Sequence, residues 1–197
     1  MPDVIDTLAG IAPGSSLDAI RAQRPQARIH AQATYDSLFT PLSEADVPRL
    51  ERFAVACFVA GLHGRREMEA FYGSGLAAAG ASAALQAAIG AAVTAARGEG
   101  PYGHYPKGPL SAEDKAGPVH HIAGPTRAAL GSRLSAAFEH THMLVFHPRD
   151  SAPPYLQALL DAGWSTTGIV VISQLVAFLS YQIRVVAGLR VLNARPA

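Results

Sequence analysis

Residues 163–192 read GWSTTGIVVISQLVAFLSYQIRVVAGLRVL, and this segment decides the fold class of the chain. It contains no proline, and Ser165, Thr166 and Thr167 each carry a hydroxyl that can cap the start of a helix. Apolar residues then occupy nearly every face of the helical period, which is typical of a helix surrounded by protein. The sequence therefore predicts one long helix at the centre of the fold or at the centre of an oligomer.

One stripe of this helix differs from the rest because nearly all of its side chains are small. It recurs at spacings of three and four residues and consists of Ser173, Ala177, Ser180, Arg184 and Gly188. Small side chains let a second helix approach closely, so Arg184 is predicted to be buried in that contact. A buried guanidinium needs a carboxylate or carbonyl partner. We expect a structural ion pair at Arg184, and an anion-binding pocket is the alternative.

The same segment is apolar enough to raise the alternative of a membrane span. Its strongest apolar run, residues 169–181, contains Ser173, Gln174 and Ser180, and two arginines follow. Spanning a bilayer takes about 20 predominantly apolar residues with few or no charges. The first residues, MPDVIDTLAG, lack the basic and apolar regions of a secretory signal. We therefore expect a soluble cytoplasmic protein that does not cross a membrane.

The composition points to one domain that assembles with further copies of itself. A chain of 197 residues can bury a full core, and 16% charged residues is well below the usual quarter. Other subunits are expected to cover part of the surface, giving a homo-oligomer of at least two chains. Lys and Arg number 16 against 15 Asp and Glu, so no basic field indicates a nucleic-acid partner. Cys57 is the only cysteine, which excludes an intrachain disulfide and a cysteine-rich zinc site.

The rest of the chain alternates helices with loops and contains no convincing strand, which predicts an all-α domain. The expected elements are two short helices before residue 27 and helices over roughly 28–39, 43–63, 65–79, 81–97, 126–146, 154–161 and 165–192. Ser43 or Asp46 is expected to cap the 43–63 helix. Residues 1–41 are interpreted as an N-terminal arm and residues 42–197 as the domain. Residues 98–125 form a proline- and glycine-rich loop, and loops of this length are usually functional or mobile.

Two segments resemble the alkylhydroperoxidase D / carboxymuconolactone decarboxylase superfamily. The first, residues 42–64, contains an Ala/Val-rich helix that ends at His63-Gly64. The second, residues 138–192, contains a helix, a proline break, a short helix ending in DAGW and a long helix with Phe178 and Arg184. The loop GPYGHYPKGPL and the helix QLVAFLSYQIRVVAGL are most similar to a subgroup described as CMD-domain proteins. The resemblance implies an alkylhydroperoxidase D-like helical bundle that is peroxidase-related.

The chain departs from this superfamily at the catalytic motif. Peroxidase members use the two cysteines of a CxxC motif, and at the matching register those positions hold Arg65 and Met68. A chain with one cysteine cannot complete the dithiol cycle, because it has no resolving thiol. We expect a small-molecule enzyme or binding pocket without dithiol peroxidase activity, and the sequence names no cofactor. The alternatives are a non-catalytic helical protein for oligomerisation or partner binding, and a one-cysteine peroxidase that uses Cys57.

The candidate catalytic residues are His63 and Cys57. Cys57 lies on an apolar helical face with Ala54, where burial raises a thiol pKa, so a core role is the main interpretation. His63 ends its helix, where an imidazole can act as a capping group instead of a catalyst. Glu51 lies twelve residues earlier, more than three turns along a straight helix, and is therefore too far away to pair with His63.

The candidate pocket or lid residues are Tyr102, His104, Tyr105 and Arg184. The first three belong to the 98–125 loop, which is expected to cover a pocket between the 43–63 helix and the C-terminal helix. They could instead reach a neighbouring subunit or act as aromatic anchors of a surface loop. No metal is expected, because His140 and His142 are two residues apart on a helix and point in nearly opposite directions.

Overall fold

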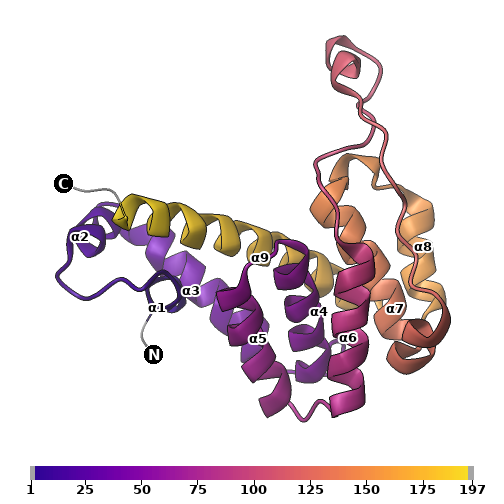
Figure 1. Cartoon of the computed structure of the whole chain (residues 1–197), viewed down its shortest axis with the longest axis horizontal. Coiled ribbons are helices and arrows are strands. Elements are labelled where there is room, and N and C mark those ends of the chain that lie inside the picture. The colour runs from indigo at the N-terminus through magenta and orange to yellow at the C-terminus, as the bar shows by residue number, and fades with distance from the viewer. Residues whose placement is uncertain (1–2, 195–197) are drawn as a thin grey trace.

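The computed structural model describes residues 3–194, and the regular secondary structure of this part of the chain is helical (Figure 1). The α-helices are α1 (Val4–Ala9), α2 (Ser16–Ala22), α3 (Pro25–Phe39), α4 (Arg49–Leu62), α5 (Arg66–Ala78), α6 (Ala83–Ala96), α7 (Gly124–Phe146), α8 (Pro153–Asp161) and α9 (Thr166–Asn193). Two short 3₁₀ helices are η1 (Pro109–Glu113) and η2 (Pro148–Asp150). The described residues contain no strand beyond one isolated bridge between Gly103 and Lys115. The expected all-α class is confirmed.

Helix α4 lies at the centre of the fold and contacts α5, α6, α7 and α9. Its sequence RLERFAVACFVAGL is apolar on most faces, so other helices can cover it on all sides. Phe58 stacks on Phe138 of α7 with 4.3 Å between the ring centroids. Gly61 faces α6 so closely that a Cβ there would lie 2.5 Å from Val93 Cγ1. The absence of a side chain at Gly61 therefore lets α6 pack directly on α4.

Helix α9 is the long helix that the sequence predicts, and it packs along α1, α3, α4, α7 and α8 (Figure 1). It begins after a serine cap, because Ser165 Oγ accepts a hydrogen bond from the Gly168 amide at 2.9 Å. On its buried side, Gln182 accepts a hydrogen bond from the Tyr72 hydroxyl of α5, and both residues are fully buried. This polar contact fixes how α9 is rotated against the α4–α5 pair.

By length and composition, α9 could cross a membrane, and 50% of its most apolar window is buried inside the fold. The core helix of a soluble protein has the same composition, so this property alone does not distinguish the two. Five other helices of the same chain, α1, α3, α4, α7 and α8, pack against α9 and cover part of its surface.

The N-terminal segment, residues 3–41, packs against the C-terminal half of α9 (Figure 1). Arg21 and Arg28 both donate to the carboxylate of Asp6, which holds α1, α2 and α3 together. Arg190 of α9 donates to the Leu8 carbonyl at 2.8 Å. The segment is thus held together internally by ion pairs, and it is held to the body by the hydrogen bonds from Arg190 and by the buried apolar residues of α1.

Helix α4 begins later than the sequence suggests, and neither Ser43 nor Asp46 caps it. The helix starts at Arg49, directly after Pro48, whose ring fixes a backbone angle that suits a helix start. Glu44 accepts the Arg49 amide at 2.7 Å and satisfies one of the free amides of the first turn. Asp46 instead accepts a hydrogen bond from the Ser165 hydroxyl at 2.5 Å and thereby contacts the start of α9.

Helix α7 is broken at Gly131, where the sequence predicts a continuous helix. Gly131 has φ 76° and ψ 170°, a backbone conformation that glycine adopts without a steric penalty. Directly after the break, Arg133 forms an ion pair with Glu51 of α4, with 2.8 Å between Nε and Oε1. The break therefore lies next to a polar contact between the two central helices.

Candidate functional site

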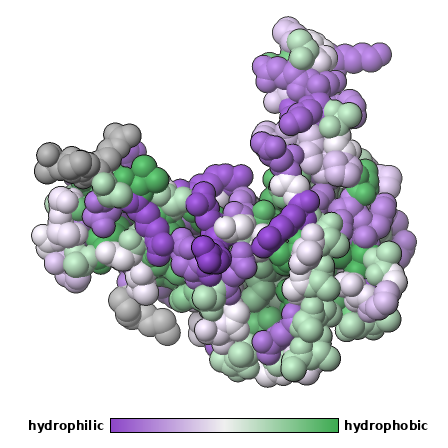
Figure 2. Space-filling model, viewed as in Figure 1, coloured by the Kyte–Doolittle hydropathy of each residue, from purple (hydrophilic) through white to green (hydrophobic). Residues whose placement is uncertain are grey.

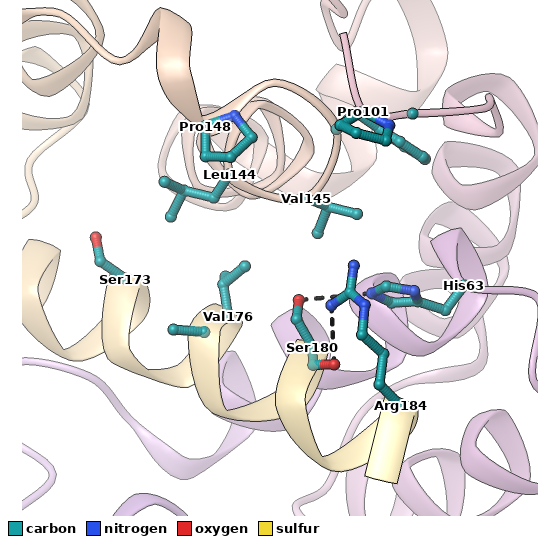
Figure 3. A pocket seen from close by; sticks show the side chains of 12 residues that line it. His63, Pro101, Leu144, Val145, Pro148, Ser173, Val176, Ser180 and Arg184 are labelled. Atoms are coloured by element: carbon teal, nitrogen blue, oxygen red, sulfur yellow. Dashed lines mark hydrogen bonds between the residues drawn. The ribbon is translucent and has the colours of Figure 1, made fainter. Parts of the chain in front are cut away.

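The largest candidate site is a groove between α7 and α9, which we call the α7–α9 groove (Figure 3). It encloses about 510 Å³, a volume within the usual range for small-molecule sites. Its lining residues are His63, Gly100, Pro101, Leu144, Val145, Phe146, Pro148, Ser173, Val176, Ala177, Ser180 and Arg184. On the face shown in Figure 2, hydrophilic residues gather in a recess between α9 and the projecting 98–125 segment.

One end of the groove is polar and carries a positive charge. The Arg184 guanidinium turns back along α9, and its Nη1 donates to the Ser180 carbonyl at 2.9 Å. The Ser180 hydroxyl lies 3.5 Å from His63 Nε2, so three polar side chains meet at this end (Figure 3). No Asp or Glu is among the residues that line the groove. An anion at this end would therefore meet attraction without a competing carboxylate.

Within a single chain, Arg184 is not buried in a structural ion pair, which corrects the prediction for the monomer; a contact with a second subunit stays a prediction. Arg184 is exposed, and in residues 3–194 it hydrogen bonds to a carbonyl on its own helix without a carboxylate partner. The stripe of small residues around it is also open, because Ala177 and Gly188 are exposed. Among the described residues, α7 reaches the stripe at Ser173, and the groove occupies the space beside Ala177, Ser180 and Arg184 that the sequence assigns to another helix.

His63 is the candidate catalytic residue that lies in the groove. Its pKa is lowered from 6.5 to about 4, first because it is desolvated and then because Arg184 and Arg65 are near. His63 is therefore neutral at physiological pH and can donate or accept one hydrogen bond at Nε2. Glu51 does not approach it, since its carboxylate is bound by Arg133. No His63–Glu51 acid–base pair forms, as helix geometry predicts.

The middle of the groove is apolar. Leu144 and Val145 project from α7, and Val176 projects from α9 toward them (Figure 3). Pro101 and Pro148 close the outer edge without contributing amide donors. This surface suits a hydrocarbon body better than a sugar or nucleotide, because those need several hydrogen bonds along their length.

The other end of the groove has a single polar side chain, Ser173 of α9 (Figure 3). His140 of α7 lies behind it, with 3.0 Å between His140 Nε2 and Ser173 Oγ. His140 is buried, and desolvation lowers its pKa to about 4. The groove thus has a positively charged polar end with three polar side chains, an apolar middle and a single serine at the other end.

Cys57 does not reach the α7–α9 groove. It lies in a separate hollow between α4, α5 and α6, close to Glu69. Burial and then the charge of Glu69 raise the pKa of the Cys57 thiol to about 12. Cys57 is therefore a protonated thiol at physiological pH, and a protonated thiol is a poor nucleophile.

Tyr102, His104 and Tyr105 do not line the groove, and the 98–125 segment contributes only its first turn, Gly100 and Pro101. Tyr102 is buried at the base of the segment, where its hydroxyl donates to the Pro118 carbonyl at 2.5 Å. The rest of the segment projects away from the body (Figure 1). Within one chain it is anchored at its base and does not form a lid, and a contact with a neighbouring subunit stays a prediction.

Tyr105 and His104 are held by residues of η2. The Arg149 guanidinium lies 4.0 Å from the centroid of the Tyr105 ring. The His104 amide donates to Asp150 at 2.8 Å, while the His104 side chain remains exposed. These contacts fit the anchoring role that the sequence left open.

A cluster of histidines lies outside the lining of the groove, and His120, His121 and His142 line a separate hollow. The ring centroids of His120 and His142 are 4.8 Å apart, and those of His142 and His147 are 5.9 Å apart. Desolvation, with the neighbouring His120 and His147, lowers the pKa of His142 to about 4. Across residues 3–194, no three His, Cys, Asp or Glu side chains are arranged to hold a metal ion.

Comparison of the chain with protein-family models, curated proteins and solved structures gives no match. The resemblance to the alkylhydroperoxidase D superfamily therefore depends on the sequence motifs alone.

Sequence reasoning missed the α7 wall of the groove and the role of His140 behind Ser173. The predicted pocket lay between α4 and α9, whereas α4 contributes only His63 at its end. Leu144 and Val145 are half-buried, which an unbroken amphipathic pattern for α7 would not distinguish from core positions. The available signal was the open stripe on α9, where Ser173, Ser180 and Arg184 share one face.

Proposed function

We propose that this chain is an alkylhydroperoxidase D-like protein without dithiol chemistry, whose α7–α9 groove binds a small organic carboxylate with an apolar body. In this proposal the protein acts in the cytoplasm as a soluble protein. Binding is the function that the groove supports best, because its polar groups suit recognition and its one titratable base, His63, is a weak proton acceptor with a pKa lowered to about 4.

The observation that carries this proposal is the guanidinium of Arg184, which has no carboxylate partner in residues 3–194 and lies in a groove lined without an acid. A guanidinium presents parallel N–H donors that match the two oxygens of a carboxylate. Ser180 and neutral His63 can each donate one further hydrogen bond. One full positive charge favours a singly charged anion over a phosphate, which usually meets several cations or a helix start.

The apolar middle of the groove supports the second half of the proposal. Burying a methylene group contributes about 0.8 kcal/mol, so a chain lying against Leu144, Val145 and Val176 adds substantial affinity. A ligand with a carboxylate head and a hydrocarbon body satisfies both regions together.

Isothermal titration calorimetry with octanoate and octanamide tests this proposal on the full chain. Octanoate is expected to bind about tenfold or more tightly than octanamide, because hydrogen bonds to a charged group contribute about 1.5–3 kcal/mol. Arg184→Met should abolish octanoate binding without lowering the melting temperature of the free protein. Arg24→Met removes an exposed arginine far from the groove and serves as the matched control. Equal affinity for the acid and the amide would refute the proposal.

A second candidate function, oligomerisation, is favoured by the open stripe on α9. Ala177, Arg184 and Gly188 are exposed although the stripe has the composition of a close helix contact. A second copy of the chain lying on this stripe would form a homo-oligomer and cover the groove. Light scattering tests it: Ala177→Glu should convert an oligomer into a monomer. A wild-type monomer at micromolar concentration would remove this candidate.

A further inference from the structure

Ser173 and His140 form a hydrogen-bonded pair at the end of the groove that lies opposite Arg184. Ser173 Oγ lies 2.8 Å from the Ile169 carbonyl on its own helix and 3.0 Å from His140 Nε2 on α7. His140 Nδ1 is buried and has no hydrogen-bond partner among residues 3–194. These three facts determine which atoms carry the protons.

The Ser173 hydroxyl has one proton, and a carbonyl oxygen can only accept. The Ile169 carbonyl therefore receives that proton, and His140 must donate its own Nε2 proton to Ser173. The opposite arrangement would place an N–H at His140 Nδ1 without an acceptor, and buried N–H groups without partners are rarer than buried acceptors. The Ser173 oxygen then accepts from His140 and keeps one lone pair for the groove.

Because of the residues around Ser173, its free lone pair favours ligand groups that donate a hydrogen bond. Nearby groove residues such as Leu144 and Val176 are apolar and supply no donor (Figure 3). A ligand group that donates a hydrogen bond would satisfy Ser173, while a group that only accepts would be desolvated without compensation. A ligand cation is disfavoured, because no Asp or Glu lines the groove to neutralise it.

We infer that the ligand of the α7–α9 groove is a hydroxy acid, with its carboxylate at Arg184 and a hydroxyl donating to Ser173 at the far end. This inference rests on the proposed carboxylate-binding function and specifies its ligand class. The Arg184 guanidinium lies at the level of Ser180, whose carbonyl it binds. Ser173 and Ser180 are seven residues apart on α9, so the two polar ends are separated by about 10 Å. An extended ω-hydroxyoctanoate spans about this distance.

The first experiment changes only the ligand and uses the wild-type protein. Calorimetry compares octanoate, ω-hydroxyoctanoate and ω-methoxyoctanoate, whose ether oxygen accepts but cannot donate. The hydroxy acid is expected to bind about three- to tenfold more tightly than octanoate, because that is the gain in affinity that one additional hydrogen bond gives. The methoxy acid should bind no more tightly than octanoate. A methoxy acid that equals the hydroxy acid would overturn the inference.

The second experiment changes Ser173. Ser173→Ala should remove the preference for the hydroxy acid while octanoate affinity stays within about twofold. Ser173→Thr keeps the hydroxyl and should restore the preference. Ser74→Ala is the matched control, because Ser74 makes the same bond to a carbonyl one turn earlier, on α5 and outside the groove. The ligand series remains informative even where the Ser173→Ala protein is unstable.

The outcomes separate this inference from the proposed function. Octanoate binding with no preference for the hydroxy acid, or a preference that persists in Ser173→Ala, overturns the inference and leaves the carboxylate site in place. A protein that binds none of the three acids refutes the proposed function, and the inference fails with it.

Discussion

Arg133 and Trp164 bind each other in two ways. The Arg133 guanidinium lies over the Trp164 ring, 3.6 Å from the centroid, and Trp164 Nε1 donates to the Arg133 carbonyl at 2.9 Å. The same guanidinium binds Glu51 of α4 and the backbone carbonyls of Asp46 and Gly163. Arg133 therefore connects α4, the segment after the α7 break and the turn before α9.

Replacing this guanidinium should destabilise the fold without touching the groove. We expect Arg133→Ala to lower the free energy of unfolding by about 2–4 kcal/mol, because charged hydrogen bonds and a cation–π contact are lost together. Urea denaturation measures the change. Arg127→Ala breaks the more exposed Arg127–Glu139 pair and should change stability by less than about 1 kcal/mol. Equal effects in the two variants would contradict the connecting role of Arg133.

Cys57 should react slowly in the folded protein. Its thiol pKa is raised to about 12 by burial and Glu69, so almost no thiolate exists at about pH 8. Alkylation by iodoacetamide should be at least about tenfold slower in buffer than in denaturing urea. Mass spectrometry follows the reaction, and a free cysteine peptide provides the reference rate.

Because the Cys57 thiol stays protonated, we expect no peroxidase turnover. Purified protein given an organic hydroperoxide and dithiol donors, including lipoyl carriers, should not exceed the rate of a Cys57→Ser control. Turnover well above that control would revive the one-cysteine peroxidase alternative.

Acid should destabilise the protein through its buried histidines. Burial lowers the pKa values of His140 and His142 from 6.5 to about 4, so the unfolded chain binds more protons in that range. Their stabilising contribution is complete above pH 6.5 and is lost as the pH falls toward 4. Each histidine contributes at most about 1.4 kcal/mol per pH unit.

Urea denaturation across this pH range measures the slope of stability against pH. His142→Phe keeps an aromatic ring against Phe146 and should flatten the slope. His30→Gln, at an exposed position on α3, is the control and should leave the slope unchanged. A slope that is identical in all three proteins would show that other groups determine the acid sensitivity.

Carboxylate binding should be independent of pH between about pH 6.5 and 8, since His63 remains neutral there. His63 has its pKa lowered to about 4 by burial and by the nearby arginines. Calorimetry with octanoate across this range should give a constant Kd, and His63→Gln should keep it within about threefold. Affinity that rises steeply as the pH drops below 7 would indicate that His63 binds the ligand as a cation.

The helices were largely predictable because local signals mark their ends. Ser165 caps α9 as expected, and the Pro13-Gly14 pair separates the first two helices. Ser43 and Asp46 carry the same kind of local signal, yet neither caps α4. Pro48 sets the helix start, and the Asp46 side chain is instead bound by Ser165, a residue far away in the sequence.

The site was less predictable because it depends on contacts between distant segments. The sequence places Arg184 on a stripe of small residues but cannot say whether another helix covers the stripe. Gly131 breaks α7 and Arg133 binds Glu51, and neither is visible in the helical periodicity of α7. The pairing of His140 with Ser173 depends on how α7 and α9 cross, which local patterns do not encode.

Two hydrogen-bonded pairs fix the position of α9 along its own axis, and so fix the length of the groove. The pairs are Gln182 with Tyr72 and Ser173 with His140. They are nine residues apart and so lie on opposite faces of the helix. Sliding α9 by one residue would break both pairs, whereas apolar packing tolerates small shifts. Homologues could therefore exchange the apolar lining to accept thicker or thinner ligands, while the span between the two polar ends stays constant.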